Sequence, residues 1–360
     1  MKKFLLRLLA AVLAVYVLWT VGQAVAFKRY ASASPPADPR GSIEIEGAYH
    51  VHSRFSDGRK DVEGIAEAAK AAGLQFIILT DHGNPNAGAL DAQGTVSGVQ
   101  VLAGSEISTN RGHLVAMGFK RPGPATTFSH EADAAASEVA ALGGITVIAH
   151  PYSKTRWSWG APSVYDGIEI LNGDSVFKDD PARTLFLAPM FLLRPTAAIL
   201  RLIRPPDDSL RKWDELLRRH PTLGFFSADA HLFYRAIFSV FHVHVLLDRS
   251  LSGSNEAARE EIFSAIEEGR FFSAVDGAAG ARGFRAELDG EKLRVSTPFD
   301  FAHETIFFKD GREVRRTDGP SAELALESPG TYRVEVHLRG RTPLHSGVPW
   351  IISNAFAVER

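Results

Sequence analysis

Short apolar runs that end in histidine or carboxylate residues are the feature that most constrains how this chain folds. From residue 43 onward these runs alternate with stretches rich in alanine, glutamate and lysine. In two of those stretches, 62–72 and 131–142, apolar residues recur at helical spacing. The apolar runs themselves lie at 43–51, 76–80, 100–103, 113–118, 145–149, 167–171 and 223–227.

This alternation predicts an α/β fold made of repeated strand–helix units that share a parallel sheet. Most of the runs are apolar at successive positions, as expected for strands that are covered on both faces. Seven such strands suggest a closed or nearly closed, TIM-like barrel. We expect the barrel at 43–280, with an insert at 176–220.

The histidines and carboxylates lie at or just beyond the C-terminal ends of these runs, where parallel barrels build their sites. Imidazole and carboxylate groups bind zinc, manganese or iron, and the chain has no cysteine for a closed thiolate site. We therefore predict a multinuclear metal centre with open positions, as hydrolysis requires. Its clusters contain His50, His52, Asp57, Asp81, His82, Glu106, His113, His150, Asp229 and His231.

Composition and charge are those of an ordinary globular protein. The formal net charge is -2, with 45% hydrophobic and 23% charged residues. Such a balance gives no global reason to expect a nucleic-acid partner. The absence of cysteine excludes a disulfide framework.

The N-terminal residues 1–30 are predicted to be a signal anchor or a signal peptide. Lys2, Lys3 and Arg7 precede an uncharged apolar stretch at 8–27, which is long enough to cross a bilayer. Ala24-Val25-Ala26 also offers a small-x-small cleavage site. Both alternatives export the rest of the chain. It would face the periplasm or extracytoplasmic space from the inner membrane, or be secreted if cleaved after Ala26, and 31–42 would be a linker.

The ordered motifs resemble those of a known family. Residues 50–58, His-Val-His-Ser-Arg-Phe-Ser-Asp-Gly, resemble the HxHxxxSDG opening of PHP-domain (polymerase and histidinol phosphatase) metallohydrolases. The motifs around His82, Glu106, His113, His150 and Asp229 resemble the later motifs in their usual order, from about residue 44 to 280. The segments 167–173 and 349–354 are similar to an exported, carbaryl-hydrolase-like branch.

The resemblance implies a distorted seven-stranded barrel that holds two or three divalent metal ions, zinc, manganese or iron. Asp81 would orient His82 or a neighbouring imidazole from outside the ligand set. Glu106 would bridge two metals. The implied ligands are His50, His52, Glu106 and Asp229 for the first metal, Asp57, His82 and His231 for the second, and Glu106, His113 and His150 for the third.

Clustered metals predict hydrolysis. Water shared between metals has a pKa lowered toward ~7, so hydroxide is available to attack phosphorus or a carbonyl carbon. We expect a phosphoesterase that acts on a small, phosphorylated molecule. A hydrolase for amide, carbamate or carboxylic ester bonds is the enzyme alternative, which a pocket of Trp157, Trp159 and the insert would favour. A non-catalytic metal- or ligand-binding protein is the third alternative.

Three residues are the candidates for catalytic roles: Asp229, His231 and Arg54. Arg54, Arg111 and Arg235 lie near metal motifs, where planar guanidinium groups can clamp a phosphate. His231 or His82 could protonate the leaving group, but a metal ligand is a poor acid. We leave that role unassigned.

Two regions lie outside the barrel pattern. The apolar segment 184–206 contains Pro189 and Pro195, which exclude one straight spanning helix. It is either a set of short helices packed over the barrel mouth or a surface that rests on a membrane. At 283–360, short runs separated by Asp-Gly and Pro-Gly turns predict a small antiparallel β-sandwich that contributes no metal ligand.

Overall fold

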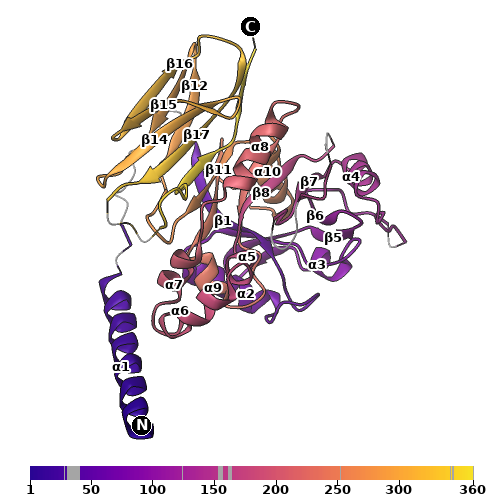
Figure 1. Ribbon diagram of the computed structural model, residues 1–360. Coiled ribbons are helices and arrows are strands. Elements are labelled where there is room, and N and C mark those ends of the chain that lie inside the picture. The colour runs from indigo at the N-terminus through magenta and orange to yellow at the C-terminus, as the bar shows by residue number, and fades with distance from the viewer. Residues whose placement is uncertain are drawn as a thin grey trace.

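The structure, a computed structural model, describes residues 1–27, 29–30, 41–123, 125–152, 157–160, 164–251, 253–340, 342 and 344–359. Within these residues the chain has a mixed α/β fold with a sheet-rich C-terminal part (Figure 1). The strands form three sheets. The predicted α/β class is confirmed.

The largest sheet begins with the first two predicted strands. β1 (Ile43–Val51) pairs in parallel with β2 (Phe76–Leu79), and β2 pairs in parallel with β4 (Val99–Ala103). On the far side of β4 lies the short antiparallel β3 (Gly94–Val96). On the other side of β1, β10 (Phe241–Leu247) and then β11 (Phe271–Val275) are antiparallel.

A second, five-stranded sheet carries the remaining strands of the predicted barrel. Its order is β5 (Ser105–Thr109), β6 (Gly112–Met117), β7 (Ile145–Ile148), β8 (Gly167–Asn172) and β9 (Leu223–Ser227). β7, β8 and β9 are parallel, as predicted. The expectation of a parallel strand is wrong for β6, which is antiparallel to both β5 and β7. Two residues connect β6 to β5, a strand that was not predicted, and so short a connection permits only an antiparallel pair.

The two sheets meet where their strands end. On one side Gly104 donates a backbone hydrogen bond to Leu79 at 2.7 Å. On the other side Ala228 donates to Tyr49 at 2.9 Å, and His52 donates to Ala230 at 3.1 Å. The strand ends that carry the predicted ligands are therefore tied to one another. One continuous TIM-like barrel stays a prediction.

The predicted helices at 62–72 and 131–142 are confirmed. α2 (Val62–Ala72) begins where the Asp61 side chain accepts a hydrogen bond from Gly64, and it ends at Gly73, whose φ of 88° suits glycine. It buries Ile65, Ala66 and Ala69. The other helices around the two sheets are α3 (Ala87–Asp91), α4 (Ala132–Ala141), α5 (Ser175–Lys178), α8 (Asp207–Leu217), α9 (Tyr234–Phe238) and α10 (Asn255–Glu267).

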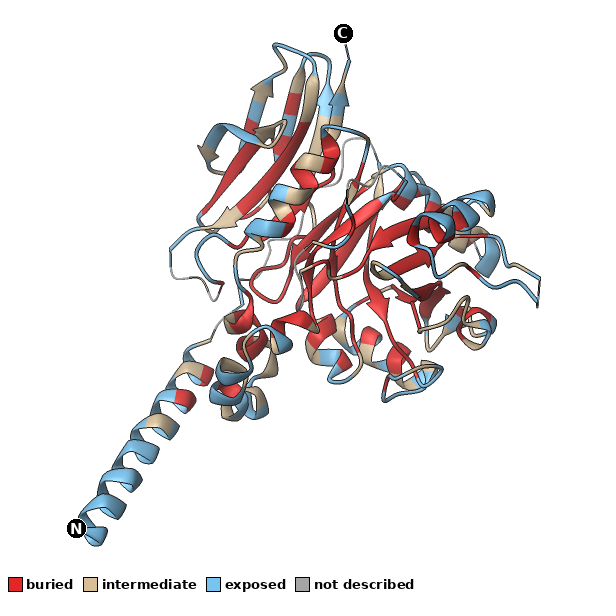
Figure 2. Cartoon of the chain, turned by 45° about the vertical axis from the view of Figure 1, so that its right-hand side comes forward, coloured by how far each residue is buried: buried red, intermediate tan, exposed pale blue. Residues whose placement is uncertain are grey.

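The apolar insert forms two helices, α6 (Pro181–Leu193) and α7 (Pro195–Leu202). Proline at the start of α7 separates them, because proline can begin a helix but cannot continue one. α7 buries four successive residues against the body, whereas most of α6 is exposed. α1 (Lys2–Ala26) projects away from the body beside α6, and nearly all of it is exposed (Figures 1 and 2).

The C-terminal part is antiparallel, as predicted, but one of its sheets continues the largest sheet. β18 (Ile351–Ser353) pairs with β11, and the buried Ile351 and Ile352 pack at this junction. β12 (Arg285–Asp289), β13 (Lys292–Ser296) and β16 (Ser321–Ala325) form the third sheet. The remaining strands extend the largest sheet: β14 (His303–Lys309), β15 (Arg312–Asp318), β17 (Gly330–Leu338) and β19 (Phe356–Val358).

Candidate metal centre

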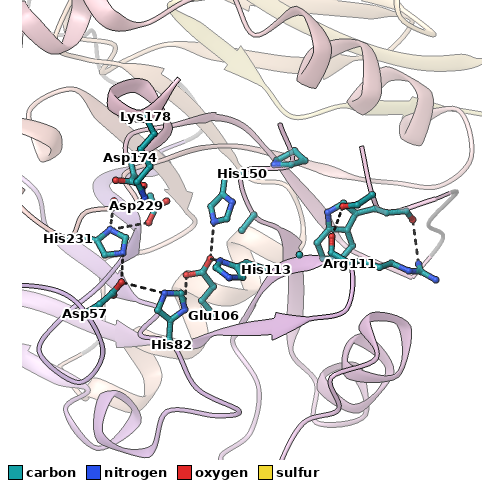
Figure 3. Close-up of a pocket in the computed structure, with 15 residues that line it drawn as sticks. Asp57, His82, Glu106, Arg111, His113, His150, Asp174, Lys178, Asp229 and His231 are labelled. Atoms are coloured by element: carbon teal, nitrogen blue, oxygen red, sulfur yellow. Dashed lines mark hydrogen bonds and ion pairs between the residues drawn. The ribbon is translucent and has the colours of Figure 1, made fainter. Parts of the chain in front are cut away.

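The nine predicted metal ligands come together at the end of both sheets. Seven of them line a cavity of about 380 Å³ (Figure 3). His50 and His52 are fully buried beneath it. The seven lining ligands are Asp57, His82, Glu106, His113, His150, Asp229 and His231, and every lining residue precedes residue 283.

Backbone geometry at three strand ends turns side chains toward this cavity. His50, His150 and Asp229 have φ angles of 64°, 28° and 43°. Residues other than glycine rarely adopt this left-handed region, which costs on the order of 1–3 kcal/mol per residue and concentrates at functional sites. Backbone hydrogen bonds that join β1 to the end of β9 hold two of these residues, His50 and Asp229, in place.

Four donor atoms converge at the buried end of the cavity. His50 Nε2 lies 3.1 Å from His52 Nε2, 3.3 Å from Glu106 Oε2 and 3.4 Å from Asp229 Oδ1. His52 Nε2 lies 3.1 Å from the same Glu106 oxygen and 3.4 Å from the same Asp229 oxygen. Four donors so spaced can surround one ion, because tetrahedral zinc–nitrogen and zinc–oxygen bonds are about 2.0–2.2 Å long.

Glu106 faces imidazole groups with both of its oxygens. Oε1 lies 2.8 Å from His113 Nδ1 and 3.0 Å from His150 Nε2. Oε2 faces His50 and His52, and His82 Nδ1 lies 3.3 Å from it. Each oxygen of this buried carboxylate thus belongs to a different group of nitrogen donors, as a bridging ligand requires.

A further group lies toward the opening of the cavity. Asp57 Oδ2 is 3.3 Å from His231 Nε2 and 3.7 Å from His82 Nε2. The His231 ring stacks on His52 with centroids 4.1 Å apart. Asp57, His82 and His231 can therefore approach a common ion, next to the four-donor group.

Orphaned polar atoms show that this donor set fits metal ions. Within the described residues, six buried side-chain atoms make no hydrogen bond, and three of them are Asp229 Oδ1, His82 Nδ1 and His113 Nδ1. Buried polar groups normally have a partner, because losing water without one costs roughly 1–3 kcal/mol. A cation bound among these atoms would supply that partner.

The electrostatics of the cluster also favour a cation. Burial by itself would lower the pKa of His52, but the neighbouring carboxylates of Asp229 and Glu106 outweigh burial and raise the pKa to about 9. Burial likewise opposes ionisation of Glu106, yet the charge of His50 and the adjacent rings of His113 and His150 hold its pKa well below the usual range. The carboxylates are thus ionised and lie beside protonated imidazole rings. Divalent ions can take the place of the protons on those rings.

Two residues that we did not assign as site residues from the sequence orient the ligands. The buried Glu169 carboxylate on β8 lies 2.6 Å from His50 Nδ1 and accepts a 2.8 Å hydrogen bond from the His150 backbone nitrogen. Asn172 donates to Glu169 at 2.8 Å and to Asp229 Oδ2 at 3.0 Å. Both lie in the segment 167–173, which was noted as an apolar run and for its resemblance, without a role for either residue.

Asp81 does not have the predicted partner. Its Oδ1 accepts hydrogen bonds from the Ser53 backbone at 2.8 Å and the Ser56 hydroxyl at 2.7 Å, and its Oδ2 accepts from the Ser53 hydroxyl at 2.9 Å. The carboxylate therefore fixes the loop between His52 and Asp57 instead of orienting an imidazole. Within the described residues, the hydrogen bonds found for the Asp81 carboxylate come from the backbone and hydroxyl groups of that loop, and none comes from an imidazole ring.

Lys178 is a lining residue that sequence reasoning missed. It follows β8 on α5, and its ammonium pairs with Asp174, another lining residue (Figure 3). Burial would lower the pKa of Lys178, but the hydrogen bond and charge of Asp174, with Asp229 and Asp57, raise it. Lys178 thus keeps its positive charge beside the cavity. The Asn172-Gly173-Asp174 turn directly after a strand is the signal that could have found it.

The predicted arginines divide between the cavity and the surface. Arg111 lines the cavity, but Asp133 holds its guanidinium with two hydrogen bonds of 2.9 and 2.8 Å. Arg54 is 68% exposed and lies 3.9 Å from Asp61, outside the lining. Arg235 is also exposed and outside the lining. Arg54 thus lies outside the cavity in which the catalytic role predicted for it would be exercised.

The aromatic residues of the alternative pocket are also divided. Trp159 is buried and lines the cavity. Trp157 does not line it, and its ring lies 4.9 Å from the Lys212 ammonium.

A family model described as PHP domain matches residues 48–149. An uncharacterized protein of Methanocaldococcus jannaschii is 25% identical over 139 residues, which cover 34% of this chain and 79% of that protein.

Solved structures show low similarity. One is a two-domain protein from Bacteroides vulgatus ATCC 8482 that contains a predicted PHP-like metal-dependent phosphoesterase. Its TM-score is 0.47 and its sequence identity 15%, and the match covers 92% of this chain and 99% of the Bacteroides chain. An amidohydrolase from Chromobacterium violaceum, with bound sulfate and no metal, has a TM-score of 0.35 and 16% identity, covering 51% and 87%. The carbaryl-hydrolase-like branch stays a prediction. The expectation of a PHP domain is supported over residues 48–149, the segment that carries His50, His52, Asp57, His82, Glu106 and His113.

Proposed function

We propose that this chain is a metal-dependent phosphoesterase. The observation that carries the proposal is Glu106, whose two oxygens face separate sets of imidazole nitrogens within one cavity. The PHP domain match over residues 48–149 supports the same class. The fold would be a distorted, TIM-like barrel with its site at the strand ends.

The chain would hold two or three divalent ions, zinc, manganese or iron. When bound, such ions lower the pKa of water so that hydroxide is available near neutral pH, and they neutralise charge that develops on the substrate. Glu106 would bridge, and its charge would offset repulsion between the neighbouring ions. The proposed ligand groups are His50, His52, Glu106 and Asp229, then Asp57, His82 and His231, then Glu106, His113 and His150.

Residues of the chain add what phosphate chemistry requires. Lys178 keeps its charge at the cavity and can hold a substrate oxygen on the side away from Glu106. Glu169 holds His50 in the tautomer that leaves Nε2 free, because its carboxylate accepts a hydrogen bond from the protonated Nδ1. Asn172 fixes Oδ2 of Asp229 and leaves Oδ1 directed at His50 and His52.

Hydrolysis of a carboxylic ester, carbamate or amide is the second candidate function. Trp159 and Pro151 give part of the lining an apolar character that would suit an uncharged substrate. Lys178 favours the first candidate, because a cation binds phosphate more strongly than a neutral carbonyl group. We therefore place phosphate esters first.

We also propose that α1 exports the chain and anchors it, so that the catalytic domain faces the extracytoplasmic space. The helix has the length and apolar composition of a membrane span, and a signal sequence would share them. The substrate would then be a phosphorylated small molecule available outside the cytoplasm.

A turnover panel tests the proposed function. Full-length protein in detergent is given aryl phosphate mono- and diesters, aryl carboxylic esters and carbamates, with added manganese or zinc. Metal-dependent release of phosphate or phosphodiester products is the expected result. His345→Gln is the matched control, because His345 is exposed and lies outside the cavity. Turnover of carboxylic esters alone would replace the first candidate with the second, and no metal-dependent turnover would contradict both.

A further inference from the structure

One side of α6 carries large apolar side chains that are exposed. Leu185 is 76% exposed and Leu192 is 86% exposed. Phe191 of the same helix packs against Phe233, with ring centroids 4.6 Å apart, and so joins α6 to the segment after His231. We call the following residues the α6 surface: Leu185, Phe186, Leu192, Leu193, Leu232 and Phe233.

Such a surface is costly in water. Exposed apolar area costs roughly 25 cal/mol per Å², and contiguous apolar patches on soluble proteins mark contacts with partners or membranes. α6 also contains no acidic residue, and Arg183 and Arg194 lie near its two ends. Apolar side chains flanked by arginine are typical of a helix that lies in the interface of a bilayer.

The neighbour of α6 indicates which partner it meets. The rings of Tyr16 and Trp19, both on α1, lie 5.1 and 5.4 Å from the Phe186 ring, and the Tyr16 hydroxyl donates to the Phe186 carbonyl. Tyr16 and Trp19 lie within the apolar stretch 8–27 that would cross the bilayer. If α1 crosses a bilayer, Phe186 therefore contacts the same bilayer. Figures 1 and 2 show α1 leaving the body on the side where α6 lies.

The α6 surface borders the candidate metal centre. Lys178 and Asp174 line the cavity, and α6 begins only three residues after Lys178. On the other wall His231 lines the cavity, and the next two residues, Leu232 and Phe233, belong to the α6 surface. The α6 surface thus follows lining residues of the cavity closely in the sequence on two of its walls.

We propose that the α6 surface lies in the bilayer interface and that the site accepts phosphate esters with a long apolar tail. The phosphate group enters the cavity beside Lys178, while the tail stays between the α6 surface and the lipid. The part concerning turnover rests on the proposed phosphoesterase function. The part concerning docking stands on the exposed residues and on α1.

Spin-label depth measurements test the docking. The chain has no cysteine, so L192C provides a single labelling site. V314C is the matched control, because Val314 is an exposed apolar residue on β15, far from α1 (Figure 1). The full chain is placed in vesicles of phosphatidylcholine with a minor share of phosphatidylglycerol.

The expected result is that oxygen relaxes the L192C label more than a water-soluble nickel chelate does, with the opposite order for V314C. Equal nickel accessibility at both positions would overturn the docking. Short label-to-label distances in L192C would show that a second copy covers the surface, and this outcome would also overturn it.

Turnover of a matched pair of substrates tests the substrate class. An aryl phosphate with a long alkyl chain is embedded in the same vesicles, and the same aryl phosphate without the chain is supplied in solution. The double variant L185D/L192D changes two strongly exposed residues that line no cavity wall. We expect the double variant to lower turnover of the embedded substrate by at least about tenfold and to leave turnover of the soluble substrate unchanged. The control variant V314D should leave turnover of both substrates unchanged.

The two ways to fail are distinguishable. If wild-type protein hydrolyses the soluble aryl phosphate but the double variant turns over the embedded substrate equally well, the inference about the substrate is wrong and the proposed function stands. If wild-type protein hydrolyses neither phosphate, the proposed function itself is wrong, while the label depths still decide the docking.

Discussion

His50 Nδ1 lies 2.6 Å from Glu169 Oε1 in the fully buried base of the candidate metal centre. A protonated Nδ1 leaves Nε2 as the lone-pair nitrogen, and Nε2 is the atom that faces His52, Glu106 and Asp229. Glu169 also accepts from the His150 backbone, so one carboxylate organises two ligands that come from different strands.

The first prediction is that Glu169→Gln weakens metal binding by about 10–100-fold, the usual cost of losing such an outer partner. The amide keeps the size of the side chain but can no longer secure the Nδ1 proton through a negative charge. Titration with manganese or zinc, followed by calorimetry, measures the change. Glu63→Gln on the exposed side of α2 is the control. Unchanged affinity in a folded Glu169→Gln protein would refute the positioning role.

The second prediction is that Glu106→Gln removes more than one metal ion and lowers turnover by several orders of magnitude. Glutamine removes a negative charge and one anionic oxygen, which leaves neighbouring cations poorly screened. Asp57→Asn or His113→Ala should remove about one ion and spare the others. Elemental analysis of the folded variants is the measurement. Full metal loading with near-normal hydrolysis in Glu106→Gln would contradict the bridging role.

The third prediction is that Lys178→Gln lowers kcat/KM for phosphate esters by about 10–100-fold, the range expected when one charged contact to the substrate is lost. Metal content should not change, because the ammonium pairs with Asp174 and is not a metal ligand. Lys70→Gln in the last turn of α2 is the matched control. If carboxylic ester turnover falls equally, Lys178 does not select phosphate.

The fourth prediction concerns topology. The charges Lys2, Lys3 and Arg7 precede the apolar part of α1, so they should stay in the cytoplasm while the rest of the chain is outside. Protease added to intact spheroplasts should digest the catalytic domain, and the domain should fractionate with membranes unless it is cleaved after Ala26. A chain recovered in the cytoplasm with its N-terminus intact would contradict this prediction.

Much of the fold and of the site could be predicted, because both depend on residues that are local in sequence. Glu106 and His150 each follow an apolar run, and parallel strands bring such ends to one edge whatever their separation in the chain. Glu106 and His113 are instead joined by the β5–β6 hairpin, which the apolar pattern did not reveal. The residues predicted as ligands come together as a group although part of the strand pattern was wrong.

The residues that were missed depend on contacts that no local pattern encodes. Lys178 reaches the cavity through the direction of α5, and the partners of Asp81 are set by the loop that Ser53 and Ser56 occupy. The position of α6 beside α1 depends on a contact between residues that are about 170 positions apart, Tyr16 and Phe186. Tertiary packing determines the position of Lys178, the partners of Asp81 and the contact between α1 and α6. Composition does not predict such packing.

A last prediction comes from histidines to which we assigned no role from the sequence. His244 is fully buried, with Nδ1 2.8 Å from Glu44 Oε1 and Nε2 2.8 Å from Asp276 Oδ2. Both partners are carboxylates, so both ring nitrogens donate and the imidazole is positively charged. Burial would lower the pKa of His244, but Asp276 and Glu44 outweigh it and raise the pKa to about 10.

The sign of the pH dependence follows from this rise. A histidine whose folded pKa exceeds the unfolded value, about 6.5, stabilises the protein fully below that value, and the contribution is lost as pH rises toward about 10. His244→Gln cannot hold the extra proton. At pH near 7 it should lower the free energy of unfolding by about 3–5 kcal/mol, the usual cost of breaking a buried charge pair. The difference from wild type should shrink as pH rises to about 10. Denaturant unfolding across this range measures it, with His345→Gln as the exposed control. A difference that stays constant with pH would show that His244 is neutral and that its two carboxylate contacts act only through packing.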